Sequence, residues 1–536
     1  MENMIPIEPL EAALPPTELI DLTTTATNTQ ISSCVQKFYS NANIFITGGT
    51  GFLGKLLVEK LLRSCTDIQT IYLLIRNKKG KDMHTRVDEM FDDPIFDRLK
   101  QENSKFRHKV VGIAGDCSIT GLGISIRDRQ RLIQDVNIVF HVAATVRFDE
   151  HIRLAMAINV HATREVIELS KQMTNLKTVI HVSTAYSNCN VQKIEETFYN
   201  APINVDDLEN MILKLSDDEL QEITPRIIGQ WPNTYTFTKA LAEAEVANNC
   251  KGLRVGVFRP AIVVSTYKEP LVAWINNLYG PNGVVAGVCK GILRTLHCHN
   301  NINANIVPAD MCVNSLICSA WDVYNSPASR SKEDVPIYNY VTSAEKPLTW
   351  YEFHSLNLLF YKNNPFTEVY WTLSFRTVKN RVLNLFYFIL LHFVPGAIMD
   401  VILTVLGKKP QMVTMYKKIL KFTDVISPFC TQEWEFTNHN VQNLWKKIDN
   451  HGRSVFFFNM AEIDWLLYFR NYVKGMRVYL FHDPLSNVEA AKRKYKRFEM
   501  LHFALKGVLH FVLIYALWSI LSMATSSITS NISSLR

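Results

Sequence analysis

The chain has 536 residues, of which 47% are hydrophobic, and this length and composition can form two or three globular units with some membrane contact. Its formal charge of +7 is modest, and the sequence has no basic stripe with interleaved aromatic residues, so no nucleic-acid partner is expected. The ten cysteines are scattered without C-x-x-C pairs, which predicts buried apolar thiols in a reducing compartment rather than a disulfide framework.

Residues 1–40 are predicted to form a flexible N-terminal arm. The opening sequence MENMIPIEPLEAALPP is acidic and interrupted by prolines, and it lacks the basic start and the apolar core of a signal peptide. The folded part that follows is therefore expected to form in the cytosol.

The stretch from Asn43 to Arg76 has the pattern of a dinucleotide-binding unit. A short β-branched run ends at Thr47, three glycines follow at G-x-x-G-x-x-G spacing, and apolar residues then repeat at helical intervals. Such a turn brings backbone close to a pyrophosphate, and the helix start offers free N–H groups. The alternative is a turn that only connects a strand to a helix. The residues predicted to contact a cofactor here are Thr47, Gly48, Gly49, Thr50, Gly51, Phe52, Leu53 and Gly54.

The residue after the second strand distinguishes the two nicotinamide cofactors. The apolar run from Ile71 to Ile75 is followed by Arg76, about 20 residues past the last glycine. An acidic residue at this place would bind the ribose 2′-hydroxyl of NADH, whereas arginine suits the 2′-phosphate of NADPH. The sequence therefore favours NADPH.

Further strands and helices alternate along the chain. Strands are predicted at 110–113, 136–142 and 178–182, with a helix over 158–173. Asp116 follows the first of these strands and is equally compatible with an adenine contact or a turn. Ala143 and Ala144 follow the second, where small side chains would let backbone lie against a cofactor. The alternation predicts an α/β fold with a doubly wound parallel sheet of the Rossmann type, whose site lies at the carboxyl ends of the strands.

A second group of candidate residues lies at these strand ends. Ser183 and Thr184 end one strand, and Tyr235 and Lys239 are spaced to lie on one face of a helix. Free tyrosine has a pKa of about 10, and a neighbouring ammonium is expected to lower it toward the working range. A hydroxyl from Thr184 or Ser183 would hold a substrate carbonyl while the tyrosine supplies a proton. Y-x-x-x-K alone is a weak signal, but it follows the glycine pattern in the expected order.

These motifs resemble the extended short-chain dehydrogenases/reductases and, more narrowly, the eukaryotic fatty acyl-CoA reductases. The resemblance covers almost everything after about residue 35. The segments that carry it are TGGTGFLG (47–54), HVAATVRFDE (141–150), HVSTAYSNC (181–189), YTFTKALAE (235–243), FRPAIV (258–263), WINNLYGPNG (274–283), VPADMCVN (307–314) and KKPQMVTMYKKI (408–419). Two departures concern backbone conformation: His161-Ala162 replaces a usual glycine-threonine pair, and Val272-Ala273 replaces a usual proline-glycine pair.

The resemblance implies the reduction of a long-chain fatty acyl-CoA to a fatty alcohol plus CoA, through a hemithioacetal and an aldehyde, with two NADPH. It assigns the oxyanion contacts to Thr184 and Tyr235 and the nicotinamide ribose to Lys239. Thr184 is preferred over Ser183 as the catalytic hydroxyl because Ser183 lies nearer the strand interior, and Pro260 to Ile262 would line the nicotinamide. It also divides the chain into a reductase domain (41–355) and a smaller helical domain (356–495).

Two apolar stretches predict contact with a membrane. Residues 502–524 are long enough to anchor the chain, and KRKYKR at 492–497 places the preceding bulk on the cytosolic side. A buried amphipathic helix is the alternative. Residues 382–406 contain His392, Pro395 and Asp400, which predicts an interfacial or re-entrant helix pair, with a buried hairpin next. The endoplasmic reticulum is favoured over the peroxisome, and the sequence has no signal for an oligomer.

No metal site is predicted. His297, Cys298 and His299 are adjacent and cannot all face one ion on regular backbone, and no second ligand pair lies nearby in the sequence.

Two rival functions share parts of this pattern. A membrane-bound hydroxysteroid or other carbonyl dehydrogenase would use the same catalytic residues, but such enzymes lack the region after about residue 350. A non-catalytic lipid-binding protein could keep the fold, but it has no physical reason to retain Thr184, Tyr235 and Lys239 together.

Overall fold

The computed structural model describes residues 32–77 and 80–534, with side chains described to residue 525. Residues 1–31 of the predicted arm lie outside the described residues. The prediction of a flexible arm is wrong for the part that follows, because Cys34–Tyr39 forms helix α2. Ser33 and Gln36 make a reciprocal capping box, and Val35, Phe38 and Tyr39 are buried.

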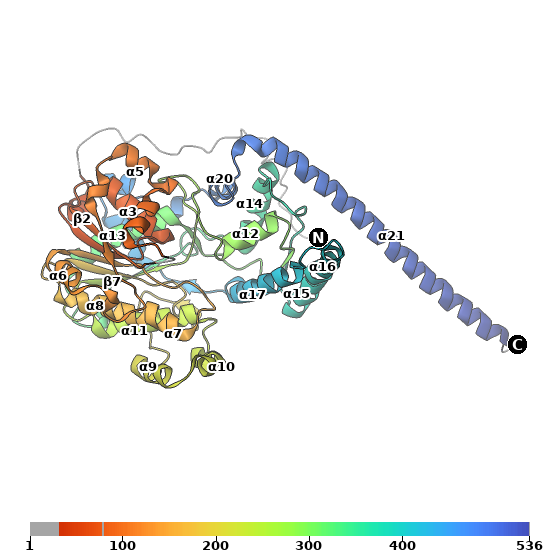
Figure 1. The fold of residues 1–536 in the computed structure, drawn as a ribbon, viewed down its shortest axis with the longest axis horizontal. Coiled ribbons are helices and arrows are strands. Elements are labelled where there is room, and N and C mark those ends of the chain that lie inside the picture. The colour runs from red at the N-terminus through yellow and green to blue at the C-terminus, as the bar shows by residue number, and fades with distance from the viewer. Residues whose placement is uncertain (1–31, 78–79, 535–536) are drawn as a thin grey trace.

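A seven-stranded parallel sheet forms the centre of the molecule (Figure 1), which confirms the predicted fold class. The strand order is β3-β2-β1-β4-β5-β7-β11, with the chain crossing over at β1 as in a doubly wound fold. The strands are β1 (Asn43–Thr47), β2 (Thr70–Ile75), β3 (Val110–Ala114), β4 (Ile138–His141), β5 (Thr178–Val182), β7 (Val255–Pro260) and β11 (Ile337–Tyr340).

Helices cover both faces of the sheet, so the strands are apolar at nearly every position. Ile44 and Ile46 of β1 face one core, and Phe45 between them faces the other. One face carries α3 (Phe52–Ser64) and α13 (Ala309–Asn325). The opposite face carries α6 (Ile126–Asp135), α8 (Ala162–Gln172) and α11 (Thr234–Asn249).

Shorter elements lie around these layers. The helices include α4 (Met83–Phe91), α5 (Asp97–Glu102), α7 (Ile152–Ala155), α9 (Val205–Lys214), α10 (Asp217–Ile228) and α12 (Pro281–Cys289). The strands are β6 (Lys193–Ile194), β8 (Ile262–Val264), β9 (Thr295–His297) and β10 (Ile306–Pro308). Ala273, where the family pattern has glycine, takes a φ of 58°, a conformation that glycine adopts with less strain.

The C-terminal region is helical and returns to the reductase region in two short strand pairs. β12 (Arg376–Val378) pairs with β9, and β13 (Glu435–Phe436) pairs with β6. The helices are α14 (Trp350–Asn363), α15 (Arg381–Phe388), the π-helical turn η6 (Ile389–Phe393), α16 (Val394–Val405), α17 (Met412–Thr431), α18 (His439–Lys447), α19 (Asn450–Val455), α20 (Trp465–Gly475) and α21 (Val488–Ser534).

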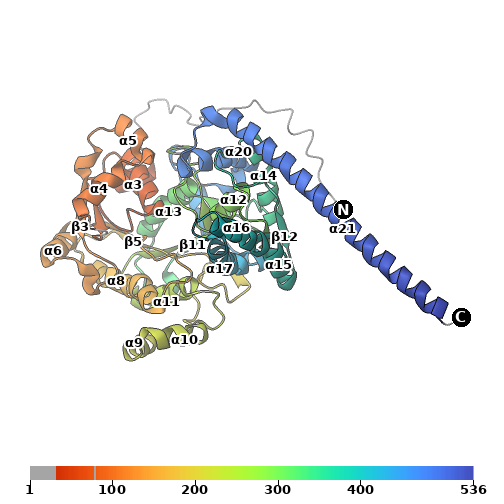
Figure 2. The ribbon, with the colours of Figure 1, turned by 45° about the vertical axis from the view of Figure 1, so that its right-hand side comes forward.

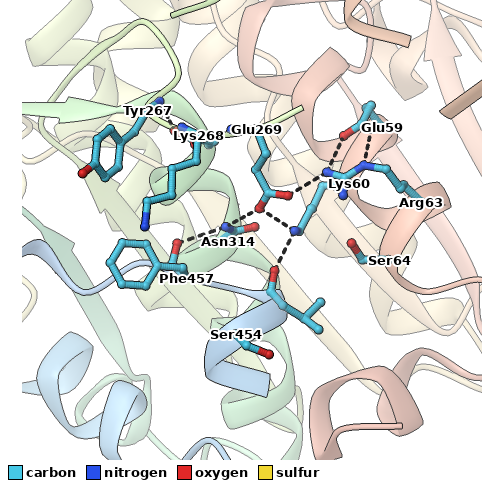
Figure 3. Close-up of polar contacts among 12 residues, drawn as sticks. Glu59, Lys60, Arg63, Ser64, Tyr267, Lys268, Glu269, Asn314, Ser454 and Phe457 are labelled. Carbon is cyan, nitrogen blue, oxygen red and sulfur yellow. Dashed lines mark hydrogen bonds and ion pairs between the residues drawn. The ribbon is translucent and has the colours of Figure 1, made fainter. Parts of the chain in front are cut away.

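A buried polar cluster also links α3 to the C-terminal region (Figure 3). Glu269 accepts from Lys60 Nζ at 2.5 Å and pairs with Arg63 at 2.9 Å, and Lys60 Nζ also donates to the carbonyl of Val455 at 2.6 Å. Asn314 of α13 donates to both Glu269 and the carbonyl of Phe457, each at 3.0 Å. The cluster therefore connects segments that are far apart along the chain.

The last helix, α21, extends away from the body (Figures 1 and 2). The apolar side chains from Met500 to Met523 are mostly exposed, and this helix is long and apolar enough to cross a membrane. Arg381–Val405 is also long and apolar enough to cross a membrane, and it forms one continuous helix with a π-helical turn in its middle rather than a helix pair.

Candidate active site

A cavity of about 960 Å³ opens at the carboxyl ends of the central strands. Its walls come from the glycine turn after β1, from the ends of β4, β5 and β7, from α11 and from the C-terminal α14 and α17. The predicted residues that line it are Gly48, Thr50, Gly51, Phe52, Leu53, Gly54, Arg76, Asp116, Ala143, Ala144, Ser183, Thr184, Tyr235, Lys239, Pro260 and Ile262.

The glycine turn has the close backbone packing that a dinucleotide cradle requires. Gly48 has a φ of +74°, and a Cβ at this position would lie 2.7 Å from the backbone nitrogen of Ala143. A Cβ on Gly54 would lie 2.1 Å from the carbonyl oxygen of Gly48. Helix α3 begins at Phe52, and its N-cap Gly51 provides no side-chain cap, so the N–H groups of the first turn can bind an anion. The turn therefore fits the pyrophosphate of a dinucleotide.

Two residues predicted to contact a cofactor face the protein interior instead. Thr47 is fully buried, and its hydroxyl lies 2.7 Å from His141 Nδ1 and accepts from the backbone N–H of Ala143 at 3.2 Å. A Cβ on Gly49 would lie 2.8 Å from the side chain of Leu73. Thr47 and Gly49 therefore pack on the interior side of the turn and support its backbone conformation.

A second arginine, absent from the predicted set, lies beside Arg76 at the end of β2. Arg86 comes from α4, lines the cavity, and donates to the carbonyl of Arg76 and to Thr50 Oγ1. Burial and the charge of Arg76 lower the pKa of Arg86. In the described part of the chain, no carboxylate lies within ion-pair distance of either guanidinium. An anion bound here would relieve their repulsion. Arg86 lies in a charged segment where no spacing rule distinguishes it.

Asp116 lies at the wall of the cavity and also stabilises a turn. It lines the cavity, and its Oδ1 also accepts from the backbone N–H of Ser118 at 2.9 Å and from the Ser118 hydroxyl at 2.8 Å. The carboxylate thus fixes the turn that follows β3, and its contact with an adenine stays a prediction.

Helix α11 and the end of β5 bring the predicted catalytic residues together. Asn233 caps α11 by accepting from the N–H of Thr236, and Tyr235 and Lys239 follow one turn apart. The Tyr235 hydroxyl hydrogen-bonds with Thr184, and Lys239 Nζ donates to the carbonyl of Val182 at 2.7 Å. Three polar groups therefore meet beside the glycine turn.

Burial determines the protonation states of Tyr235 and Lys239. It raises the pKa of Tyr235 to about 12, with the hydrogen bond to Thr184 opposing the rise. It lowers the pKa of Lys239 to about 8, with the charge of Glu243 opposing the fall. The predicted lowering of the tyrosine pKa is wrong, because desolvation dominates and Lys239 is directed at the backbone of β5. At neutral pH Tyr235 holds its proton and can donate it.

The Ser183 hydroxyl hydrogen-bonds outside the group formed by Thr184, Tyr235 and Lys239. Its hydroxyl donates to Glu243 at 2.5 Å, and Glu243 forms a fully buried ion pair with Arg259 at 2.6 Å. Ser187 also donates to Glu243, at 2.8 Å. This network ties the end of β5 to α11 and β7, and it leaves the hydroxyl of Thr184 as the one that bonds with Tyr235. Neither Glu243 nor Arg259 was identified as a candidate from the sequence.

The far end of the cavity is apolar and depends on the C-terminal region. Phe148 stacks on Tyr235 with ring centroids 5.8 Å apart, and Phe429 of α17 lies 5.3 Å from Phe148. Other residues from distant segments that complete this wall are Leu296, Trp350, Phe353, His354, Ile426 and Cys430. One cavity thus joins a dinucleotide cradle and a proton donor to an apolar channel.

A glycine turn on a parallel seven-stranded sheet, with threonine, tyrosine and lysine at the strand ends, defines a short-chain dehydrogenase/reductase. Family models described as "Male sterility protein" match residues 46–316 and 391–483. The chain is 42% identical to "Fatty acyl-CoA reductase wat" of Drosophila melanogaster over 491 residues, 92% of this chain and 94% of that protein. It is 34% identical to the human "Fatty acyl-CoA reductase 1" over 498 residues, 93% and 95% of the two chains. The protein belongs to the fatty acyl-CoA reductase family.

Solved structures agree on the fold. The reductase domain of a nonribosomal peptide synthetase from Mycobacterium tuberculosis aligns with a TM-score of 0.53 at 16% identity, covering 84% of this chain and 96% of that one. The terminal R domain of the myxalamid PKS-NRPS pathway aligns with a TM-score of 0.51 at 17% identity, covering 83% and 93%. The match to fatty acyl-CoA reductases over nearly the whole chain, including the C-terminal region, separates this protein from dehydrogenases of the same fold that lack that region.

Proposed function

We propose that the protein reduces long-chain fatty acyl-CoA to fatty alcohol and CoA, with NADPH as the reductant. The observation that carries the proposal is the continuity of one cavity, from the glycine turn past Thr184 and Tyr235 to the apolar wall around Phe429. The polar end suits a dinucleotide, and the apolar end suits a fatty acyl chain. The near-full-length similarity to fatty acyl-CoA reductases supports the same substrate class.

When bound, the nicotinamide supplies the hydride. The protein's part is to hold the acyl group and manage charge and protons. Thr184 and Tyr235, which already share a hydrogen bond, would both donate to the carbonyl oxygen and stabilise the negative charge that develops on it. Collapse of the hemithioacetal releases CoA as a thiol and leaves an aldehyde in the cavity.

In the second reduction the aldehyde oxygen becomes an alkoxide and takes the proton of Tyr235. The raised pKa of Tyr235 keeps that proton in place until the charge develops. Lys239 would bind the nicotinamide ribose from the end of β5, where its ammonium donates to the carbonyl of Val182. Ala143, Ala144, Pro260 and Ile262 would line the cofactor.

Selection of NADPH over NADH would depend on Arg76 and Arg86. We expect Arg76→Ala to raise the KM for NADPH by about ten- to a hundredfold, the loss of one or two charged hydrogen bonds, and to leave the NADH value nearly unchanged. Arg86→Ala should act in the same direction, since Arg86 also orients the Arg76 backbone. Steady-state kinetics with both cofactors measures this. Arg98→Ala, which removes a partly exposed arginine paired with Glu102, is the control. Equal effects on both cofactors would show that the 2′-phosphate binds elsewhere.

The long apolar helix α21 suggests a membrane anchor. We propose that it crosses the membrane with the catalytic region on the cytosolic side, because KRKYKR lies immediately before the apolar segment. The endoplasmic reticulum is the proposed location. Glycosylation acceptor sites placed before and after the helix would report the orientation, and modification of the site before it would contradict the proposal.

The test of the reaction is lipid analysis of cells that express the full chain and are fed fatty acids of several lengths. New fatty alcohol should appear with the wild-type chain. Tyr235→Phe keeps the ring stacked on Phe148 but removes the proton, so we expect turnover to fall by about 10²–10⁴-fold while NADPH binding is retained. Near-normal activity in this variant would remove Tyr235 as the proton donor. No alcohol from any acyl length, with the protein folded in the membrane, would favour another carbonyl substrate or a non-catalytic lipid-binding role.

A further inference from the structure

The 381–405 helix, formed by α15, η6 and α16, is attached to the body along one narrow stripe. Asn384, Phe388, His392 and Gly396 recur at four-residue intervals and are buried. A Cβ on Gly396 would lie 2.9 Å from the ring of Tyr416, so α16 packs closely on α17. The stripe therefore follows the helix over most of its length.

Three polar contacts fix this stripe to the reductase region and to α17. The Asn384 side chain accepts from the Thr295 hydroxyl at 2.8 Å, and His392 Nε2 accepts from the backbone N–H of Arg294 at 2.9 Å. Asp400 accepts from the backbone N–H groups of Gln411 and Met412 at 2.8 Å and so caps the start of α17. The polar residues that made this segment a poor transmembrane candidate are thus used within the protein.

The remaining surface of the helix is apolar and uncovered. Its large apolar side chains are from 45% to 81% exposed, whereas soluble proteins rarely expose a contiguous apolar patch of this extent. We call these residues the outer face: Val382, Leu383, Leu385, Phe386, Ile389, Leu390, Val394, Ile398, Met399, Val401, Ile402, Val405 and Leu406.

Charge and position indicate what covers the outer face. Exposed basic residues flank it at both ends, with Lys379 before the helix, Arg381 at its first position, and Lys408 and Lys409 after it. Basic residues that border an apolar helix face match the anionic head groups of a membrane. Figures 1 and 2 both place α15 and α16 at the end of the body from which α21 extends.

The start of the apolar part of α21 is near the same place. His502 accepts from Trp371 Nε1 at 3.0 Å, and the backbone N–H of the neighbouring Tyr370 donates to the carbonyl of Lys290 at 3.0 Å, four residues before the Arg294 that donates to His392. The bilayer that receives α21 would therefore begin at the level of the 381–405 helix.

A transmembrane orientation of the 381–405 helix is incompatible with its packing. α17 lies along α16 and carries the exposed Lys417, Lys418 and Lys421, which would enter the bilayer with it. We propose that the outer face of α15 and α16 lies in the cytosolic leaflet of the membrane that α21 crosses, with the helix parallel to the surface and not spanning it. The occupant of this face is lipid hydrocarbon.

This arrangement places the apolar end of the cavity beside the membrane. The 381–405 helix packs against β9 and α17, and these two elements line the cavity with Leu296, Ile426 and Phe429. This inference rests on the proposed function. The acyl chain is exchanged directly between the cavity and the leaflet, while the polar CoA part stays on the aqueous side.

The test is site-specific photo-crosslinking of the full chain in vesicles of phosphatidylcholine and phosphatidylserine with radiolabelled acyl tails. A benzophenone amino acid is placed at Phe386 or at Val401 of the outer face, and at Ile126 as the control, which is 80% exposed on the distant α6. Leu513 of α21 is the positive control. We expect lipid adducts from 386, 401 and 513 and none from 126. Adducts from 513 alone, or adducts of 386 and 401 with a second copy of the chain, would overturn the proposal.

Protease cleavage tests whether the helix spans the membrane. In sealed microsomes, trypsin added outside should cut after Lys408, which is exposed beyond the helix, whereas Pro410 blocks cleavage after Lys409. Cleavage only after detergent treatment would place these lysines in the lumen and overturn the proposal. Both readouts are independent of turnover, so they can fail or succeed whether or not the protein reduces acyl-CoA.

Kinetics tests the exchange of the acyl chain. Phe386→Asp combined with Val401→Asp should raise the KM for a membrane-partitioned long-chain acyl-CoA several-fold and leave that for a short water-soluble one unchanged. Ile126→Asp should change neither. Equal effects on both substrates would show that the outer face does not deliver the acyl chain.

Discussion

At the scale of single residues, the chemistry depends on how deeply ordinary side chains are buried. Tyr235 and Lys239 have pKa values moved in opposite directions by the same loss of solvent, which leaves a protonated phenol beside an ammonium that can lose its proton near physiological pH. We therefore expect Lys239, and not Tyr235, to limit the alkaline side of the activity profile.

We expect kcat/KM to fall as pH rises through about 8, because Lys239 loses its proton there while Tyr235, with a pKa near 12, keeps its own. Lys239→Arg retains the charge and should move this limb to higher pH, even if its maximum is lower. A pH series of initial rates for both proteins measures the two limbs. An unchanged limb in the arginine variant would assign it to another group.

Site residues that belong to a short sequence pattern can be predicted from the sequence. Site residues that reach the cavity from distant segments of the chain cannot. The glycine turn and the Tyr235–Lys239 spacing follow from chain geometry over a few residues, so they were found. Arg86 reaches the cavity from a charged helix, and Phe429 comes from α17, so neither has a sequence signal. The tyrosine pKa was mistaken because burial is a property of the folded structure and not of the motif.

At the scale of elements, the strands were predictable because a parallel sheet covered on both faces needs apolar residues throughout. Helix α2 was missed because six residues are too short for a periodic signal, although its capping box is visible in Ser33 and Gln36. The placement of the 381–405 helix carries no periodic signal, because the partners of His392 and Asp400 lie in other segments of the chain.

The cluster around Glu269 shows what joins these elements. Lys60 and Arg63 are only 5% and 6% exposed, and their charges hold the pKa of Glu269 below its usual range against the effect of burial. Because that pKa is lowered, the stabilisation is present above the normal carboxyl range and is lost as pH falls below it.

We expect Glu269→Ala to lower the free energy of unfolding by about 3–5 kcal/mol, because it leaves a buried lysine without a counter-charge. Glu89→Ala, which breaks the exposed pair with Lys81, should cost less than about 1 kcal/mol. Denaturant unfolding in detergent compares the two. Similar small losses would mean that the cluster is hydrated and contributes little.

At the scale of the whole molecule, the reductase and C-terminal regions share one site. The sequence predicts a boundary near residue 355, and the family models also match two separate stretches. The structure has strand pairs across that boundary, and the apolar wall of the cavity takes Ile426 and Phe429 from beyond it. Contacts between regions so far apart carry no periodic signal, which is why the sequence revealed the glycine-turn end of the cavity and not its apolar end.

The pairing of β13 with β6 has a consequence for how the protein folds. Trp434 donates to the carbonyl of Cys189 at 3.0 Å, and these residues are 245 positions apart in the chain. Contacts of such high sequence separation form slowly, because a long loop must close before they contribute any stability. The reductase sheet can therefore assemble first with its apolar channel open to water. Before α17 packs on it, such a sheet would expose an apolar surface that favours aggregation, so we expect folding yield to depend on the C-terminal region.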